Sequence, residues 1–198
     1  MKALQSEGDL IRQFKTELTT ASEFCFGMAL VTKNGLDLIR SSIAHCLERG
    51  GHGRVLFGVD LPTEPGAIEI LCEIETQHKG NFRLRRFHAG ETFFHPKFSI
   101  FFGKTGPKTA IIGSSNLTEG GLSANYETNV LIDDRRVVRQ LLDYFEEHFE
   151  GAHSKTVDQS WLDQYRHLWI ERKKAEQRQR RLRDKARTLG RPSVDIPC

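Results

Sequence analysis

The chain has 198 residues, of which 38% are hydrophobic and 28% are charged, and its formal net charge is +3. This length and apolar content are enough for one globular domain with a real core and a large solvated surface. No long uncharged apolar run occurs, and the first residues lack the apolar core of a signal peptide. We therefore expect a cytoplasmic protein that does not enter a membrane.

The first part of the chain alternates predicted helices and strands. Residues 5–19 have the apolar spacing of a short amphipathic helix, and the apolar run Phe24–Thr32 predicts a buried strand. The run Leu36–Leu47 has a period of 3.6, which is typical of a helix, and it stops at Gly50-Gly51. The strand Arg54–Val59 follows, so this part of the chain reads as a β-α-β unit.

Five more elements are expected in the middle of the chain. A helix over about 66–77 leads to a strand at Phe82–Phe87. Three further apolar runs read as strands, at Phe93–Phe102, Thr109–Ser114 and Tyr126–Ile132. This order predicts an α/β fold with a mixed β-sheet flanked by helices.

Polar side chains interrupt these last three runs. His95 and Lys97 stand two apart and would share one face of a strand, as would Ser114 and Asn116, and Glu127 lies in the third run. Neighbouring strands could bring an imidazole, an ammonium, a hydroxyl, an amide and a carboxylate to one place. Such a cluster suits the chemistry of phosphate esters.

This pattern resembles the phospholipase D superfamily, whose motif runs His-x-Lys, then an Asp, then Gly-Ser-x-Asn. The matching positions are His95, Lys97, Gly113, Ser114 and Asn116, and Glu127 falls where the nuclease branch places an acid that orients its histidine. The resemblance is specific over residues 93–132 and extends as a fold pattern over 20–150. One position departs from it, because Phe102 stands where the family has its mainly structural Asp.

The resemblance implies an α/β sandwich and a covalent mechanism. Lys97, Ser114 and Asn116 would hold the phosphate oxygens while His95 attacks phosphorus and forms a phosphohistidine. Glu127 would fix the tautomer of the imidazole and stabilise its charged form. We expect no metal ion and no cofactor.

The leaving oxygen needs a proton, which a second motif copy supplies in this family. The segment His153-Ser154-Lys155 repeats the His-x-Lys spacing, but no Gly-Ser-x-Asn follows it. Because only one complete motif is present, we expect a homodimer in which two copies of His95 share one site.

Two more helices are expected after the motif. One covers Val137–Phe149, and another begins near Asp158 with an apolar stripe that fades beyond Ile170. From there to Arg187 the apolar residues are sparse, so this part either projects or frays before Gly190-Arg191-Pro192 ends it. The expected domains are 1–157, the phosphodiesterase domain, and 158–198, a helix with a basic tail.

Positive charge is concentrated in that tail. Residues 166–191 hold eleven Lys or Arg against three acidic residues, whereas residues 1–165 hold 18 against 22. A basic cluster can bind nucleic acid through its phosphates, although a solvated helix explains the same composition. The candidate contacts are Arg172, Lys173, Lys174, Arg178, Arg180 and Arg181. Arg83 and Arg85 share one face of a predicted strand and could also hold a phosphate backbone or simply be solvated.

The favoured function is a metal-independent nuclease, and specifically a DNA endonuclease of the restriction or defence type; DNA is favoured over RNA. The single motif, Glu127 and the basic tail favour it over a lipase. The alternative is a non-catalytic, dimerising nucleic-acid-binding module of a larger defence complex with a helicase partner. Four cysteines, at positions 25, 46, 72 and 198, show no Cys-x-x-Cys pairing, so neither zinc nor a disulfide is favoured.

Overall fold

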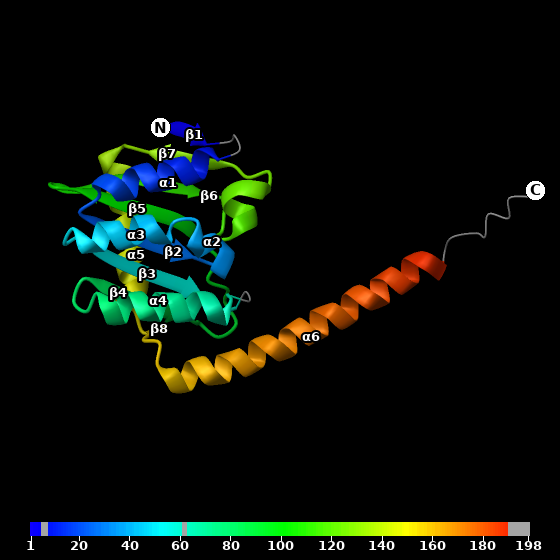
Figure 1. The fold of residues 1–198 in the computed structure, drawn as a ribbon. Helices are drawn as coiled ribbons and strands as arrows, with labels where there is room; N and C mark the ends of the chain where they lie inside the picture. The colour runs from blue at the N-terminus through cyan, green and yellow to red at the C-terminus, as the bar shows by residue number, and fades with distance from the viewer. Residues whose placement is uncertain (5–7, 61–62, 190–198) are drawn as a thin grey trace, which may run out of the picture. The chain divides into compact units, whose positions relative to one another are not determined.

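The computed structural model describes the backbone of residues 1–4, 8–60 and 63–189 (Figure 1). The chain divides into two compact units, with the boundary between Asp158 and Gln159. We call the first the sheet domain; the second contains the helix α6, Gln159–Leu189. None of the helices in the described ranges is long and apolar enough to cross a membrane.

The sheet domain is built on one mixed sheet of eight strands, in the order β1-β7-β6-β5-β2-β3-β4-β8 (Figure 1). The strands β2, β3 and β4 pair in parallel, and the remaining pairs are antiparallel. The bounds are β1 Lys2–Leu4, β2 Glu23–Met28, β3 His52–Gly58, β4 Phe82–Phe87, β5 Lys97–Gly103, β6 Gly106–Gly113, β7 Asn129–Ile132 and β8 Ser154–Lys155. This sheet with its helices confirms the expected α/β class.

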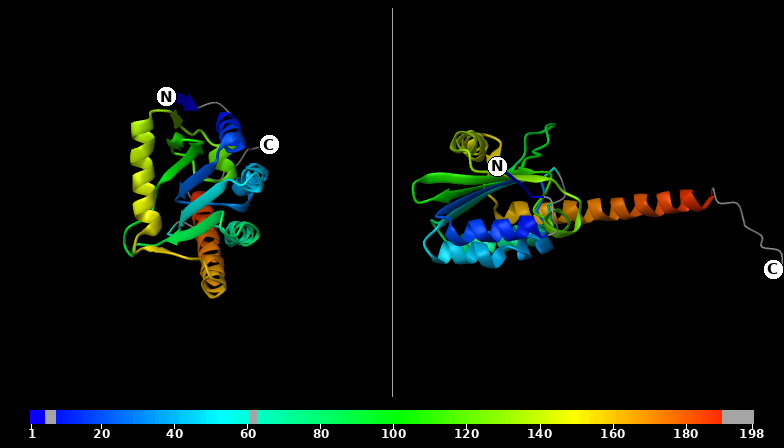
Figure 2. Two further views of the ribbon diagram at one scale, coloured as in Figure 1. Left: turned by 90° about the vertical axis from the view of Figure 1, so that its left-hand side faces the viewer. Right: turned by 90° about the horizontal axis from the view of Figure 1, so that it is seen from above.

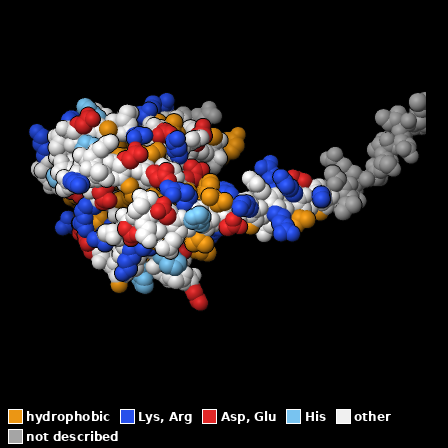
Figure 3. All heavy atoms as spheres, turned by 60° about the horizontal axis from the view of Figure 1, so that its bottom comes forward, with side chains coloured by type: hydrophobic (Ala, Val, Ile, Leu, Met, Phe, Trp, Pro, Cys, Tyr) orange, Lys and Arg blue, Asp and Glu red, His pale blue; other side chains and the backbone are white. Residues whose placement is uncertain are grey.

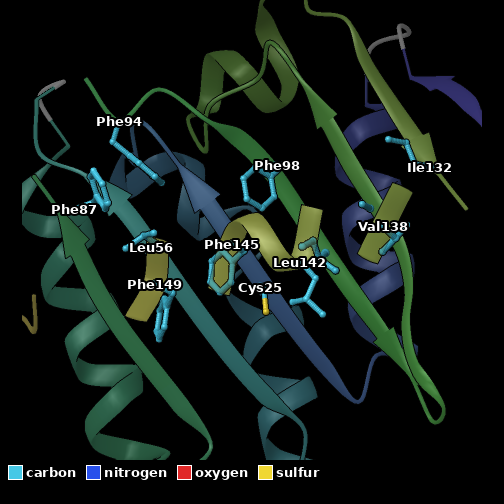
Figure 4. Packing of buried hydrophobic residues seen from close by; sticks show 12 residues of the cluster. Cys25, Leu56, Phe87, Phe94, Phe98, Ile132, Val138, Leu142, Phe145 and Phe149 are labelled. Atoms are coloured by element: carbon cyan, nitrogen blue, oxygen red, sulfur yellow. The ribbon is translucent and has the colours of Figure 1, made fainter. Parts of the chain in front are cut away.

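Helices cover both faces of the sheet (Figure 2). One face carries α1, α3 and α4, and the other face carries α5, which crosses the strands (Figures 2 and 4). The bounds are α1 Asp9–Thr20, α2 Lys33–Asp37, α3 Arg40–Glu48, α4 Pro65–Gln77 and α5 Arg135–Glu150; a short π-helix, η1, spans Gly120–Ala124.

The strand directions bring several chain ends to one edge of the sheet. Met28 pairs with Lys97, and Gly113 pairs with Asn129, so the carboxyl ends of β2 and β6 meet the amino ends of β5 and β7. The carboxyl ends of β3 and β4 lie at the same edge because both strands run parallel to β2. We call this the motif edge.

The face under α5 holds a cluster of buried apolar residues (Figure 4). Val138, Leu142, Phe145 and Phe149 recur at helical spacing and are at most 2% exposed. They pack against strand residues that include Cys25, Leu56, Phe98, Ile100 and Ala110. Burying each large apolar side chain contributes about 1.5–3 kcal/mol, so this cluster fixes α5 on the sheet.

The opposite face is held by aromatic contacts. Phe14 of α1 makes edge-on ring contacts with Phe26 of β2 at 5.7 Å and with Phe101 of β5 at 5.8 Å between centroids. Glu17, buried beside them, accepts a hydrogen bond from Thr109 Oγ1 at 2.8 Å. The sheet therefore has a largely apolar layer on each side, and the motif residues lie outside these layers at one edge.

Several expected bounds were wrong. The strands β5 and β7 begin later than predicted, and β6 begins earlier and ends one residue sooner than predicted, so His95, Ser114 and Glu127 lie in loops at strand ends instead of within strands. Asn116 lies in the same loop as Ser114. Pro96 explains one boundary, because it has no N–H to continue the ladder before β5. The strand predicted to reach Thr32 ends at Met28, since the chain turns there into a new helix.

The helix predicted at Leu36–Leu47 is two helices, α2 and α3. Thr32 caps α2 by accepting a hydrogen bond from Gly35 N at 3.2 Å, so the helix begins earlier than expected. The predicted strand at Phe82–Phe87 matches β4. The strands β1 and β8 escaped prediction because each is only two or three residues long.

The predictions for the C-terminal part of α6 and for the start of the first helix had different outcomes. The α6 helix is continuous to Leu189, so fraying beyond Ile170 is wrong within the described residues. Ion pairs at i,i+3 spacing support it, including Lys174–Glu171 at 2.8 Å. The predicted stop at Gly190-Arg191-Pro192 and the predicted helical start over 5–7 lie outside the described residues.

Candidate active site

His95 and Lys97 meet at the amino end of β5. Lys97 is the first residue of the strand, and its Nζ lies 3.0 Å from His95 Nε2 and 3.1 Å from Nδ1. The same ammonium donates to the backbone oxygen of His95 at 3.2 Å. A neutral imidazole has one acceptor nitrogen, so the ammonium donates to only one of the two ring atoms. Burial lowers the pKa of Lys97, and the Glu127 carboxylate opposes that shift.

The loop that carries His95 is tied down on both sides. Pro96 accepts a hydrogen bond from Ala29 N at 2.8 Å, which joins the loop to the end of β2. Phe94 N donates to Asp60 Oδ2 at 3.3 Å, and the other oxygen of Asp60 lies 3.2 Å from His88 Nδ1. Asp60 thus positions the backbone directly before the histidine, a role that the sequence analysis missed. Its only signal in the sequence is its place directly after a predicted strand.

The Gly-Ser-Ser-Asn run lies where β6 leaves the sheet. A β-carbon at Gly113 would collide with the backbone oxygen of Thr128 and with Oδ1 of Asn129, so only glycine fits this close approach of β6 to β7. The next residue, Ser114, is exposed and sits at the opening of this turn. The glycine of the motif is therefore a packing requirement of the sheet.

Ser114 and Glu127 form a hydrogen-bonded pair across the ends of β6 and β7. Ser114 Oγ donates to Glu127 Oε2 and accepts from Thr128 N at 3.0 Å. Asn125 Nδ2 donates to the other carboxylate oxygen of Glu127 at 3.3 Å. Within the described ranges no hydrogen bond joins Glu127 to His95, so the orienting role of Glu127 stays a prediction.

Asn129 holds the segment between Ser114 and Asn116. It is buried, its Nδ2 donates to Ser115 Oγ at 2.8 Å, and its Oδ1 accepts from Ser115 N at 3.4 Å. Leu117, which follows Asn116, donates its backbone N–H to the backbone oxygen of Leu30 at 3.2 Å, in the segment directly after β2. Nothing in the sequence singles out Asn129, because a polar residue inside a predicted strand gives no sign of what it contacts.

Asn116 carries the last side chain of the motif. Its Oδ1 is buried and has no hydrogen-bond partner among the described residues. Such an unpaired acceptor costs about 1–3 kcal/mol and is rare outside functional or water-bound sites. The amide therefore sits in a place where a bound group could complete its hydrogen bonds.

Two hollows open beside these residues, on opposite faces of the sheet. The first has a volume of about 470 Å³ and is lined by Phe93, His95, Pro96, Lys97, Phe98, Ile112, Leu141 and Tyr144. The second has a volume of about 390 Å³ and is lined by Leu4, Gly8, Leu10, Gly121, Leu122, Ser123, Ala124, Asn125, Tyr126, Glu127 and Asn129. The first borders α5 and the second borders α1 and η1, so the motif lies between them.

The arginines predicted to hold nucleic acid from β4 contact α5. Arg83 forms a two-point ion pair with Glu150 at 2.9 and 3.3 Å, and Arg85 lies 3.9 Å from the same carboxylate. Both guanidinium groups also lie over the ring of Phe149, at 5.0 and 5.8 Å. The Arg83 hydrogen bond lowers the pKa of Glu150. These contacts join β4 to α5, and a role in binding stays a prediction.

The cationic residues of α6 that were predicted to bind nucleic acid lie in a different environment from Arg83 and Arg85. Lys173 and Lys174 pair with glutamates of the same helix at 3.2 and 2.8 Å. Arg178, Arg180 and Arg181 are exposed and form no ion pair with a described residue. Figure 3 shows Lys and Arg side chains along this helix.

Comparisons with known proteins agree with this architecture. Residues 22–149 match the family described as cardiolipin synthase, PLD-like domain. Nuc of Salmonella typhimurium, a phospholipase D family member, is similar with a TM-score of 0.62 and 16% identity, covering 79% of this chain and 96% of that chain. NucT from Helicobacter pylori is similar with a TM-score of 0.60 and 15% identity, covering 75% and 91%.

A third similar structure is TrmBL2, an archaeal chromatin protein, with a TM-score of 0.53 and 19% identity, covering 79% of this chain and 54% of that chain. No curated protein matches the sequence. The family match spans the sheet from β2 to α5 and includes every residue of the motif. On this match and the shared fold, the chain belongs to the phospholipase D superfamily.

Proposed function

We propose that this protein is a metal-independent phosphodiesterase that cleaves nucleic acid, and specifically a DNA endonuclease of the restriction or defence type. One observation carries the proposal: the motif edge gathers His95, Lys97, Ser114, Asn116 and Glu127 from three strand ends. This set supplies a nucleophile, a cation, hydrogen-bond donors and a carboxylate, which is what displacement at a phosphodiester requires.

The reaction has two steps. An unprotonated nitrogen of His95 attacks phosphorus, the N–P bond forms, and the bond to the leaving oxygen breaks. Lys97 offsets the negative charge on the non-bridging oxygens and the Asn116 amide donates to them; the Ser114 hydroxyl joins by turning its single proton from Glu127 to the phosphate. Water then attacks phosphorus, breaks the N–P bond and releases the second product.

The leaving oxygen takes up a proton in the first step. One complete motif is present in the chain, and the His153–Lys155 repeat lies at β8, on the outer edge beside β4. We therefore infer a two-fold homodimer in which the His95 of the second copy donates this proton. Light scattering tests the inference; a monomer that retains full cleavage activity contradicts it.

Nucleic acid is favoured as the substrate by the cations of α6. Exposed arginines attract a phosphate backbone with little dependence on sequence. TrmBL2, an archaeal chromatin protein with a similar fold, is described as showing a novel mode of DNA binding. This likeness supports the same substrate. DNA is the expected substrate, although the charges alone serve RNA equally well.

The test is cleavage of plasmid DNA, single-stranded DNA and RNA in excess EDTA. We expect cleavage to survive chelation and to fall about 10⁴-fold or more in His95→Ala, since loss of a covalent nucleophile has effects of that order. His52→Ala is the matched control, because His52 is exposed at the opposite end of β3. Loss of all cleavage in EDTA contradicts the proposal.

A second candidate is a non-catalytic, dimerising binding module that works with a helicase partner in a larger complex. The observation in its favour is that Glu127 bonds to Ser114 and Asn125 instead of to His95. Binding without cleavage, equal in the wild type and in His95→Ala, would identify this function.

A further inference from the structure

Exposed aromatic side chains gather at the motif edge. Among the described residues, three Phe, Tyr or Trp side chains are exposed: Phe93 at 69%, Tyr144 at 41% and Tyr126 completely. Phe93 stands two residues before His95, and Tyr126 directly precedes Glu127. All three line one of the two hollows beside the motif.

The three rings differ in what they contact. Tyr144 is stacked on His148 at 4.1 Å between centroids and makes an edge-on contact with Phe98 at 6.0 Å, so its ring is held by the protein. No described aromatic ring contacts Phe93 or Tyr126. These two rings therefore keep flat faces available for a ligand.

The two free rings stand on opposite sides of the reactive groups. Phe93 lines the first hollow with His95 and Lys97, on the face covered by α5. Tyr126 lines the second hollow with Glu127, on the face covered by α1. A phosphate held at the motif would thus have an aromatic ring on each side.

We propose that the ligand of this edge is a single-stranded segment of nucleic acid, with bases stacked on Phe93 and Tyr126 while the motif holds the phosphate between them. This inference rests on the proposed function and names its substrate class. Unpaired bases have free faces that stack on aromatic side chains regardless of sequence, whereas a duplex keeps its bases stacked on each other.

A second copy of the chain is the competing occupant of these rings. In the shared-site dimer proposed above, the second copy brings its own His95 to the phosphate, so it must leave the hollows beside the motif open for the strand on either side of that phosphate. Nucleic acid covers the same apolar rings and at the same time delivers the phosphate to Lys97. The exposed position of the rings at the rims of the hollows, beside the groups that would hold the phosphate, therefore favours the nucleic acid.

The experiment measures binding in the full-length His95→Ala protein, which removes turnover. Three labelled ligands of equal length are compared: a single strand, the same strand in a duplex, and a strand whose central nucleotides are abasic. We expect the single strand to bind at least about 5-fold more tightly than the abasic strand if one ring stacks a base, and at least about 30-fold if both do, since these factors are the lower ends of the ranges for one and two stacked bases.

Ring substitutions sharpen the test. Phe93→Leu and Tyr126→Leu keep apolar surface without an aromatic face, and each should reduce the preference for the base-bearing strand several-fold; Tyr126→Phe keeps the ring and should keep the preference. Val137→Ala, at an exposed apolar residue on the first turn of α5, is the control. Circular dichroism verifies folding.

Two results would overturn the inference: equal affinity for base-bearing and abasic strands, or variants that become monomeric in sedimentation while the preference for bases persists. The second result would assign the rings to contact between copies. Hydrolysis of bis(p-nitrophenyl) phosphate by the wild type, and its loss in His95→Ala, tests the proposed function separately, so failure of one claim is distinguishable from failure of the other.

Discussion

The motif edge and helix α6 use cationic side chains in opposite ways. At the motif edge Lys97 is half-buried, lies 3.0 Å from His95 Nε2, and begins a strand whose position the whole sheet fixes. On α6 the side chains of Arg178, Arg180 and Arg181 are exposed. Lys97 therefore has defined contacts in the sheet domain, whereas the three arginines share the same exposed environment.

This contrast separates two kinds of electrostatic work. A cation that stabilises a transition state must lie within hydrogen-bond distance of one phosphate oxygen, so in the proposed mechanism no other cation could replace Lys97. A cation that neutralises the backbone contributes through counterion release, so each lost arginine should weaken binding by a similar small factor. The comparison therefore predicts large effects on rate at the sheet edge and graded effects on affinity along α6.

Removal of the Lys97 ammonium should have the largest effect on the cleavage rate, and it tests whether rate and DNA affinity depend on different cations. We expect Lys97→Met to reduce cleavage by about 10²- to 10³-fold with little change in DNA affinity, since one donor to a developing charge has this effect. Lys97→Arg, which keeps the charge, should recover part of the rate. A loss of DNA affinity as large as the loss of rate would show that Lys97 serves to bind DNA, like the arginines of α6, and would contradict a specific role in the transition state.

The pH dependence of the cleavage rate provides a second test of the role of the Lys97 ammonium. Burial lowers the pKa of Lys97 from the ordinary value of 10.5, so the group loses its charge at a lower pH than an exposed lysine. Cleavage should therefore fall on the alkaline side below pH 10.5, and Lys97→Arg should move that limb upward. A pH–rate profile that stays flat to 10.5 contradicts the assignment.

Asn129 tests whether the motif edge needs its buried support. Asn129→Ala leaves Ser115 without its partner, so we expect the free energy of unfolding to fall by about 1–3 kcal/mol and cleavage to fall with it. Urea unfolding measures the first effect. The control is Asn34→Ala, because the hydrogen bond of Asn34 to Glu119 is exposed and its loss should cost less than about 0.5 kcal/mol.

The sequence predicted most of the longer elements and located the motif residues, but it did not predict which contacts hold the motif in place. Apolar periodicity located α5 and β4, since both are long and bury one face. The contacts of Asp60 and Asn129 join residues distant in sequence, and no local pattern signals them. Strand ends at the motif were wrong because Pro96 and the close turn at Gly113 override β propensity.

The α6 arginines offer a graded test on the other side of the comparison. Replacing Arg178, Arg180 and Arg181 together by Gln should weaken DNA binding and reduce the salt slope, by up to about 0.9 for each lost phosphate contact. The cleavage rate at saturating DNA should not change. Lys104→Gln is the control, at an exposed lysine of the β5–β6 turn. An unaltered slope would assign these arginines to solvation.

The smallest expected effect concerns Phe102, which stands in place of the family Asp. It lies five residues beyond Lys97 along β5, at a register shift, about 17 Å from the motif edge by strand geometry. Its ring packs against the apolar cluster under α5. Phe102→Leu should therefore change the cleavage rate by less than about twofold. A larger change would show that this position is coupled to the motif.

The central claim is that the His95 imidazole attacks phosphorus directly. The most direct measurement is a denaturing quench during turnover of ³²P-labelled DNA in EDTA, followed by mapping of the labelled peptide. Acid-labile, alkali-stable phosphate on His95, absent in His95→Asn, is the predicted result. Label on another residue, or cleavage by the wild type with no protein-bound phosphate at any time, would contradict it.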